Sequence, residues 1–311
     1  MRGETFALIY LALAKWMTYV GLFMFTGACA ARLVIVSLSV RRLGLSQAET
    51  NLLEKWLRNL ALGSVVIVLL AALARLLAQS YVTFGIEEPV TLELIRIVGF
   101  ESRWGGRWWQ QVVAAGVALV AVVCVCVRPK FGWWVASAAV VGLVTTLPLT
   151  GHAMAGGDGA LISWALQSVH GLAAGLWLGT LAAVLVLARG LRVSRCLDRD
   201  RVIAELVHTF SPLAITAVLA VLVTGAFTAI LYLDNFRQLW ETAYGRTLLI
   251  KVSLVLATGS IGAYNWLRLR PRLGEARGTA VLFYSGGAEL LLALVLLGVT
   301  AVLVHLPPSG E

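Results

Sequence analysis

Histidine and methionine are the rare side chains of this sequence that could carry chemistry. The 311 residues hold four of each, one of the methionines being Met1, and a single short motif, His152-Ala153-Met154, places the two types together. An imidazole and a thioether without a carboxylate cage suit copper, and above all Cu(I), better than calcium or magnesium. His152 and Met154 are therefore candidate copper ligands.

His170 is the second candidate ligand. It lies about ten residues into a long apolar segment, a depth near the midplane of a bilayer. Ser163, Gln167, His170 and Ala174 follow 4-3-4 spacing, which places them on one helix face, and Asp158 precedes this stripe. An ionisable group at mid-membrane faces the bundle interior or a wet cavity. The stripe thus predicts a polar route from Asp158 past Gln167 to His170; the alternative is one buried histidine bonded to a backbone carbonyl.

His305 and Lys251 complete the candidate set. His305 ends the last apolar segment and could join the ligands His152 and Met154. The same two histidines, His152 and His305, are the pair that a bound haem would need. Lys251 lies one turn inside the seventh apolar segment. Because an ammonium group repels a cation, we expect Lys251 to be a structural or gating charge and not a ligand.

The composition shows which elements must position these residues. Hydrophobic residues make up 59% of the chain and charged residues only 13%, whereas a soluble domain carries about 25% charge. This balance excludes a cytosolic enzyme, a disordered tail and a nucleic-acid binder, despite a net charge of +9. No Walker loop, Gly-x-Ser-x-Gly, HExxH or CxxC motif occurs, so we expect a membrane protein that is not an enzyme.

Eight stretches are apolar enough to cross a bilayer, which predicts an all-α bundle of eight transmembrane helices forming one integral membrane domain over residues 1–311. A tight hairpin at Arg128–Gly132 joins the third and fourth, and an interfacial helix over 89–100, anchored by Trp104, Trp108 and Trp109, is expected in the 81–111 segment. The predicted spans are Trp16–Leu38, Leu60–Ser80, Val112–Val127, Trp133–Leu149, Leu161–Ala188, Pro212–Leu233, Thr247–Leu267 and Ala288–His305.

The basic residues predict the orientation. Alternate connections hold fifteen lysines and arginines against six in the other set. By the positive-inside rule, both termini lie outside the cytoplasm and the arginine-rich connections lie within it. Lys15, Arg32 and Arg75 lie near span ends and are expected to snorkel to the interface. Glu289, at the predicted start of the last span, is expected to be interfacial.

The second half of the chain resembles the copper resistance protein D family over about residues 145–273, and the first half matches only by its number and pattern of spans. One departure is Thr180, where the family commonly has a second glycine. The residues that carry the resemblance are Gly151-His152-Ala153, the segment from His170 through Trp177-Leu178-Gly179 to Leu181, Phe210-Ser211-Pro212, Thr224-Gly225, the segment Tyr244-Gly245-Arg246 to Lys251, Gly262-Ala263-Tyr264-Asn265, and Pro271.

The resemblance implies a multi-pass protein of the bacterial inner membrane that moves copper between periplasm and cytoplasm, usually described as uptake. It also implies a small periplasmic copper-binding protein as partner, and it carries His152 and His170 over as functional positions. Two alternatives stay open from the sequence: a haem-binding membrane cytochrome, and an assembly factor that delivers copper without transporting it.

Overall fold

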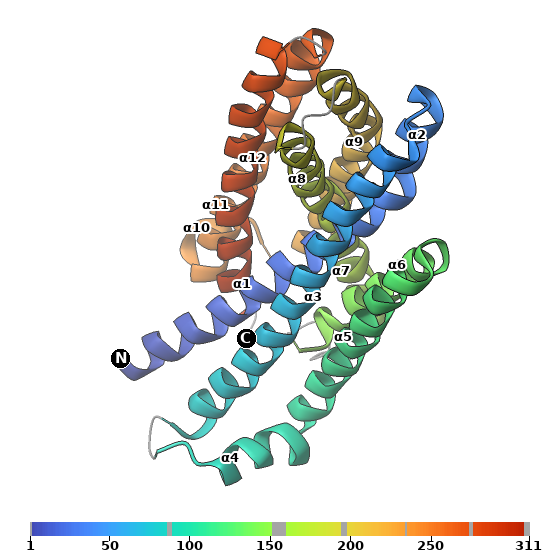
Figure 1. The fold of residues 1–311 in the computed structure, drawn as a ribbon. Helices are drawn as coiled ribbons and strands as arrows, with labels where there is room; N and C mark the ends of the chain where they lie inside the picture. Colours follow the sequence, from blue (N-terminus) through green and yellow to red (C-terminus); the bar gives the residue numbers. More distant parts are fainter. Residues whose placement is uncertain are drawn as a thin grey trace.

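The computed structural model describes residues 2–85, 89–150, 160–193, 198–233, 235–273 and 276–307. Nearly all of these residues are helical and none is in a strand (Figure 1). The helices are α1 (Arg2–Ala30), η1 (Ala31–Val36), α2 (Ser37–Leu43), α3 (Gln47–Phe84), α4 (Leu92–Arg96), η2 (Ile97–Glu101), α5 (Arg103–Val127), α6 (Pro129–Thr146), η3 (Pro148–Thr150), α7 (Ala160–Ala174), η5 (Gly175–Gly179), α8 (Thr180–Val193), α9 (Arg199–Tyr232), α10 (Gln238–Glu241), α11 (Ala243–Tyr264), η6 (Asn265–Leu269), η7 (Arg270–Arg272) and α12 (Ala276–Leu303).

The predicted all-α membrane bundle is confirmed. Seven continuous helices in the described residues are long and apolar enough to cross a membrane. Three of them run through a π-helical segment without a break, so that α1–η1–α2, α7–η5–α8 and α11–η6–η7 each act as one span. The remaining predicted span is α6, which has 18 residues and packs antiparallel to α5.

The α5–α6 hairpin is as tight as the sequence predicts. Helix α5 ends at Val127 and α6 begins at Pro129 in its first helical position, where a proline costs no backbone hydrogen bond. A Cβ atom on Gly132 would collide with the backbone of Val125. Glycine at this position therefore lets the two helices meet directly after the turn.

The 81–111 segment contains the expected short helix, as α4 followed by η2, at one end of the bundle (Figure 1). The tryptophans after it belong to the first turns of α5 and not to a separate anchor. Trp108 is buried, and its indole N–H donates to the carbonyl of Ala72 in α3 at 2.8 Å. Trp108 thus joins α5 to α3, so the aromatic cluster packs the bundle as well as lying near its end.

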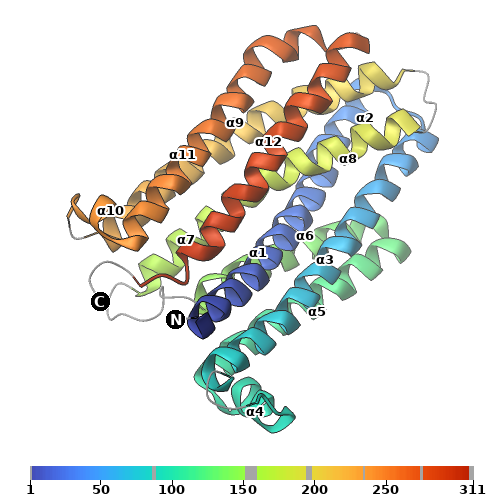
Figure 2. The ribbon, with the colours of Figure 1, turned by 90° about the vertical axis from the view of Figure 1, so that its left-hand side faces the viewer.

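Helix α1 runs through the centre of the bundle and contacts α3, α6, α8 and α12 (Figure 2). Its closest partner is η5, because a Cβ atom on Gly27 or Gly179 would collide with the backbone of the other helix. Gly175 lies against Thr26 in the same contact. Gly175 and Gly179, four residues apart on one helix, thus allow α1 to cross this segment closely.

The two ends of the bundle carry different connections. The end of α2, the end of α8 and the start of α9 lie together at one end, with the start of α12 (Figures 1 and 2). Both chain termini, α4 and α10 lie at the opposite end. We call the end with the α2, α8, α9 and α12 connections the arginine-rich end. It is distinct in the fold from the end with the chain termini.

Candidate functional site

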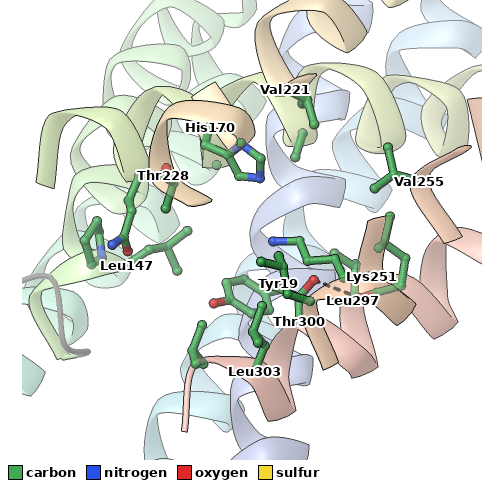
Figure 3. Close-up of a pocket in the computed structure, with 18 of the residues that line it drawn as sticks. Tyr19, Leu147, His170, Val221, Thr228, Lys251, Val255, Leu297, Thr300 and Leu303 are labelled. Carbon is green, nitrogen blue, oxygen red and sulfur yellow. Dashed lines mark hydrogen bonds between the residues drawn. The ribbon is translucent and has the colours of Figure 1, made fainter. Parts of the chain in front are cut away.

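A cavity of about 180 Å³ lies between α1, α7, α9, α11 and α12. It extends from Val221 and Val255 inside the bundle to Pro148, Tyr244 and Leu306 at the end with the chain termini. Its wall is mostly apolar, with a few polar side chains that point inward (Figure 3). A concave, largely apolar space with a few converging polar groups is the usual form of a small-ligand site.

His170 from α7 lines this cavity, and its hydrogen bond defines which ring nitrogen is available. Nδ1 lies 2.9 Å from the Thr224 hydroxyl of α9. That hydroxyl already donates its one hydrogen to the carbonyl of Ala220 at 2.6 Å. We therefore assign Nδ1 as the donor to Thr224, and the ring also has a hydrogen bond to the backbone of Val221, as in the alternative of a histidine bonded to a backbone carbonyl. In this tautomer Nε2 carries no hydrogen and keeps its lone pair. A histidine whose second nitrogen is held in this way is prepared to bind a metal through Nε2.

Gly225 makes room for the His170 ring. A Cβ atom on Gly225 would lie 3.3 Å from Cε1 of His170, which is tighter than an ordinary contact. Thr224 and Gly225 are consecutive on α9, so one holds the ring by a hydrogen bond and the other leaves space beside it. Thr224 and Gly225 together therefore fix the position of the His170 ring.

Gln167 lies one turn before His170 and lines the same cavity. Its amide nitrogen donates to the Tyr232 hydroxyl at 2.9 Å and approaches the Ser163 hydroxyl at 3.3 Å. Ser163 and Tyr232 are themselves 2.9 Å apart. The polar face expected along this helix is therefore present, and Tyr232 of α9 completes it.

Two lysines face the cavity, and the sequence indicates only one of them. Lys251 of α11 points into the same space as the His170 ring (Figure 3). Lys15 of α1 also lines the cavity and is 4% exposed, and its amine donates to the carbonyl of Leu147 at 3.1 Å. The expectation that Lys15 snorkels to the interface is wrong, because α1 is the central helix and its lysine is enclosed by neighbours. Arg75 is likewise buried, with a 2.6 Å hydrogen bond to Gln111.

The other candidate ligands are not brought to His170 in the described residues. His152, Met154 and Asp158 lie outside the described residues. His305 follows α12, and its Nδ1 donates to the carbonyl of Ala301 at 2.7 Å. It is not among the residues that line the cavity. Across the described ranges, no cluster of three or more histidine, cysteine or acidic side chains forms a closed metal cage.

Glu289 is a buried carboxylate that sequence reasoning misplaces. It lies thirteen residues after the start of α12 and is 4% exposed, so it is not interfacial. The sequence predicts that the last span begins at residue 288, whereas in the structure α12 begins at Ala276 and continues through Gly286 and Gly287. The carboxylate therefore lies near the middle of the span.

Glu289 is held by residues of two π-helical segments, η5 and η6, and, through Asn265, by a serine of its own helix. Asn265 at the start of η6 donates to Oε2 at 3.1 Å and is itself bound by the Ser285 hydroxyl. Trp177 of η5 also hydrogen-bonds to this carboxylate, and the same tryptophan lines the cavity. Among the described residues, none forms a salt bridge with Glu289. Trp177 is thus the wall between the cavity and a second polar cluster.

Comparison with known proteins identifies the family. The model of the copper resistance protein D-like N-terminal domain matches residues 6–164, just over half of the chain, and the copper resistance protein D model matches residues 204–303. The chain belongs to the copper resistance protein D family. In this family member, His170 lies in the stretch between the two matched regions, and Lys251, Asn265 and Glu289 lie within the second.

One curated relative supports the same assignment. The copper transport protein CutJ of Bacillus subtilis (strain 168) is 29% identical over 276 residues. The match covers 85% of this chain but 48% of the relative, so the chain spans about half of that protein's length. No solved structure matches. The motif residues His170, Thr224, Gly225 and Lys251, which carry the family resemblance, come together at the cavity.

Proposed function

We propose that the chain carries copper, as Cu(I), across the bacterial inner membrane through the cavity at His170. The observation that carries this proposal is the Nε2 lone pair of His170, which is left free in the cavity by the hydrogen bond of Nδ1 to Thr224. Copper is here the transported substrate and not a resident cofactor. A carrier must release what it binds, so a site with few ligands fits transport better than a closed cage.

The entry route of this proposal begins at the end with the chain termini. His152 and Met154, with His305 as a third ligand, receive copper there from a small periplasmic copper-binding partner. The distribution of basic residues supports a periplasmic location for this end, with uptake toward the arginine-rich end. Copper then moves from Asp158 past Gln167 to His170.

The exit route leads past Trp177. The cluster of Glu289, Asn265 and Ser285 is the next polar group beyond this side chain. A carboxylate inside a membrane span marks an ion pathway in general. We therefore place Glu289 after His170 on the route to the arginine-rich end, with Lys251 as the charge that gates entry.

Reconstitution of the purified chain tests the proposal. We expect liposomes containing wild-type protein to accumulate Cu(I) supplied outside, and those containing His170→Ala to take up no more than empty liposomes. His208→Ala is the matched control, because His208 lies outside the cavity and bonds to Arg270 at 2.8 Å. This control is expected to transport at the wild-type rate.

Other outcomes distinguish the alternatives. Copper bound stoichiometrically, without uptake above empty liposomes, would replace transport by a delivery role. A Soret band in the purified protein would instead indicate a haem-binding membrane cytochrome. Equal copper uptake by wild type and His170→Ala would overturn the proposal.

A further inference from the structure

The described lining of the cavity offers hydrogen-bond donors and positive charge but no carboxylate. Lys15 and Lys251 line it together with the hydroxyls of Tyr232 and Tyr244. None of its lining residues in the described part of the chain is aspartate or glutamate. A bare copper cation at His170 would therefore meet repulsion from the two lysines and no carboxylate in the described lining, and in a poorly screened interior such repulsion is strong.

Lys251 is a cationic side chain of this wall that lacks a partner among the described residues. Lys15 has a hydrogen bond to the carbonyl of Leu147 at 3.1 Å, whereas Nζ of Lys251 has no hydrogen-bond or ion-pair partner among the described residues. Figure 3 shows Lys251 reaching toward the space in front of the His170 ring. A partly buried lysine without a partner is costly, and an anion beside it lowers that cost.

The copper side of the site is incomplete in the same place. Nε2 of His170 is the one imidazole ligand in the described wall, and that wall contains no methionine or cysteine. Cu(I) is soft and prefers soft ligands. A small soft anion between copper and Lys251 would supply a second ligand and occupy the space that the amine faces.

We propose that the cavity binds Cu(I) together with a small monovalent anion of the halide class. In this arrangement the anion coordinates the copper ion held by Nε2 of His170 and accepts a hydrogen bond from the amine of Lys251. This inference rests on the proposed transport of copper and specifies the form in which the metal is carried. The copper–anion pair has no net charge, so an apolar bundle accommodates it at lower cost than a bare cation.

Measurement of Cu(I) affinity in two salts tests the proposal. With purified protein and a competing chelator at equal ionic strength, we expect wild type to bind Cu(I) about tenfold more tightly in chloride than in gluconate, a difference of about 1.4 kcal/mol. Lys251→Met should remove this difference, and Lys251→Arg should retain it. Lys130→Met, an exposed lysine at the start of α6, is the matched control and should behave as wild type.

Two results of this measurement would overturn the inference. One is a wild-type affinity that is equal in both salts. The other is tighter Cu(I) binding by Lys251→Met in chloride and in gluconate alike, which would show that Lys251 only repels copper.

A measurement without copper separates this inference from the proposed function. Bromide alone should raise the unfolding temperature of wild type above its value in gluconate, and Lys251→Met should lose that increase. If bromide stabilises through Lys251 while His170→Ala still transports copper normally, the anion site stands and the proposed route fails. If copper transport depends on His170 but bromide has no effect that depends on Lys251, only the anion site is refuted and the proposed transport route stands.

Discussion

His170 depends on its two neighbours on α9. Thr224 accepts the hydrogen bond from Nδ1 because its own hydrogen is already given to Ala220, and Gly225 leaves space for the ring. The ring is therefore held in one orientation and one tautomer. Loss of a residue that orients a metal-binding histidine typically lowers metal affinity by about 10- to 100-fold.

Thr224→Val tests this positioning role. Valine has a similar shape but no acceptor for Nδ1, so we expect the affinity for Cu(I) to fall about 10- to 100-fold. Chelator competition on the purified variants measures the change. Thr224→Ser keeps the hydroxyl and should restore binding. Thr216→Val, an exposed threonine of the same helix, is the control, and an equal loss in it would contradict the role of Thr224.

The functional residues differ in how visible they are in the sequence. His170 and Gln167 can be found because histidines are rare here and their spacing defines one helix face. Lys15 and Glu289 cannot be found in this way, because whether a residue near the end of an apolar run is buried depends on which helices surround it. Both are 4% exposed only because α1 and α12 are enclosed at those positions.

At the scale of the helices, the crossing of α1 with η5 positions the cavity wall. Gly27 and Gly179 bring the two backbones into contact, and Trp177 within η5 lines the cavity. The second π-helical segment near the site, η6, begins with Asn265 beside Glu289. Such segments frequently mark functional sites, because the changed turn redirects side chains. Here both redirect a side chain to the same carboxylate.

Gly179→Ala tests this crossing. Its new methyl group would collide with the carbonyl of Phe23, so we expect destabilisation by about 1–3 kcal/mol. Gly63→Ala is the control, since a Cβ atom there meets nothing within 4 Å and alanine favours the helix by about 1 kcal/mol. Thermal unfolding in detergent measures both. An unchanged or higher unfolding temperature for Gly179→Ala would show that α1 and η5 are not in the close contact described above.

At the scale of the whole molecule, the fold separates two ends that differ in charge. The expected cytoplasmic connections contain fifteen of the 25 lysines and arginines, and the opposite set contains six. The cavity reaches the end with fewer basic residues, at Tyr244 and Leu306. A cation approaching from that side meets less repulsion, which agrees with the proposed direction of entry.

Cysteine labelling in intact cells tests this orientation. In a variant without the native cysteines, we expect an impermeant maleimide to label Phe236→Cys from outside and Lys130→Cys only after lysis. Both positions are exposed and lie at opposite ends of the bundle, before α10 and at the start of α6. Labelling of Lys130→Cys in intact cells, with Phe236→Cys protected, would show that the chain has the opposite orientation and that copper enters from the other side.

The sequence by itself determined that this chain is a bundle of membrane helices, which end carries the basic residues, and that His170 lies deep within a span. These properties follow from local composition and from 3.6-residue periodicity, which are readable along the chain. Only the tertiary structure decided that Lys251 and Lys15 share a cavity with His170, that Thr224 sets the histidine tautomer, and that Glu289 is buried behind Trp177. Each of these depends on which helices pack together, because neighbours from distant segments decide burial, charge and hydrogen bonding.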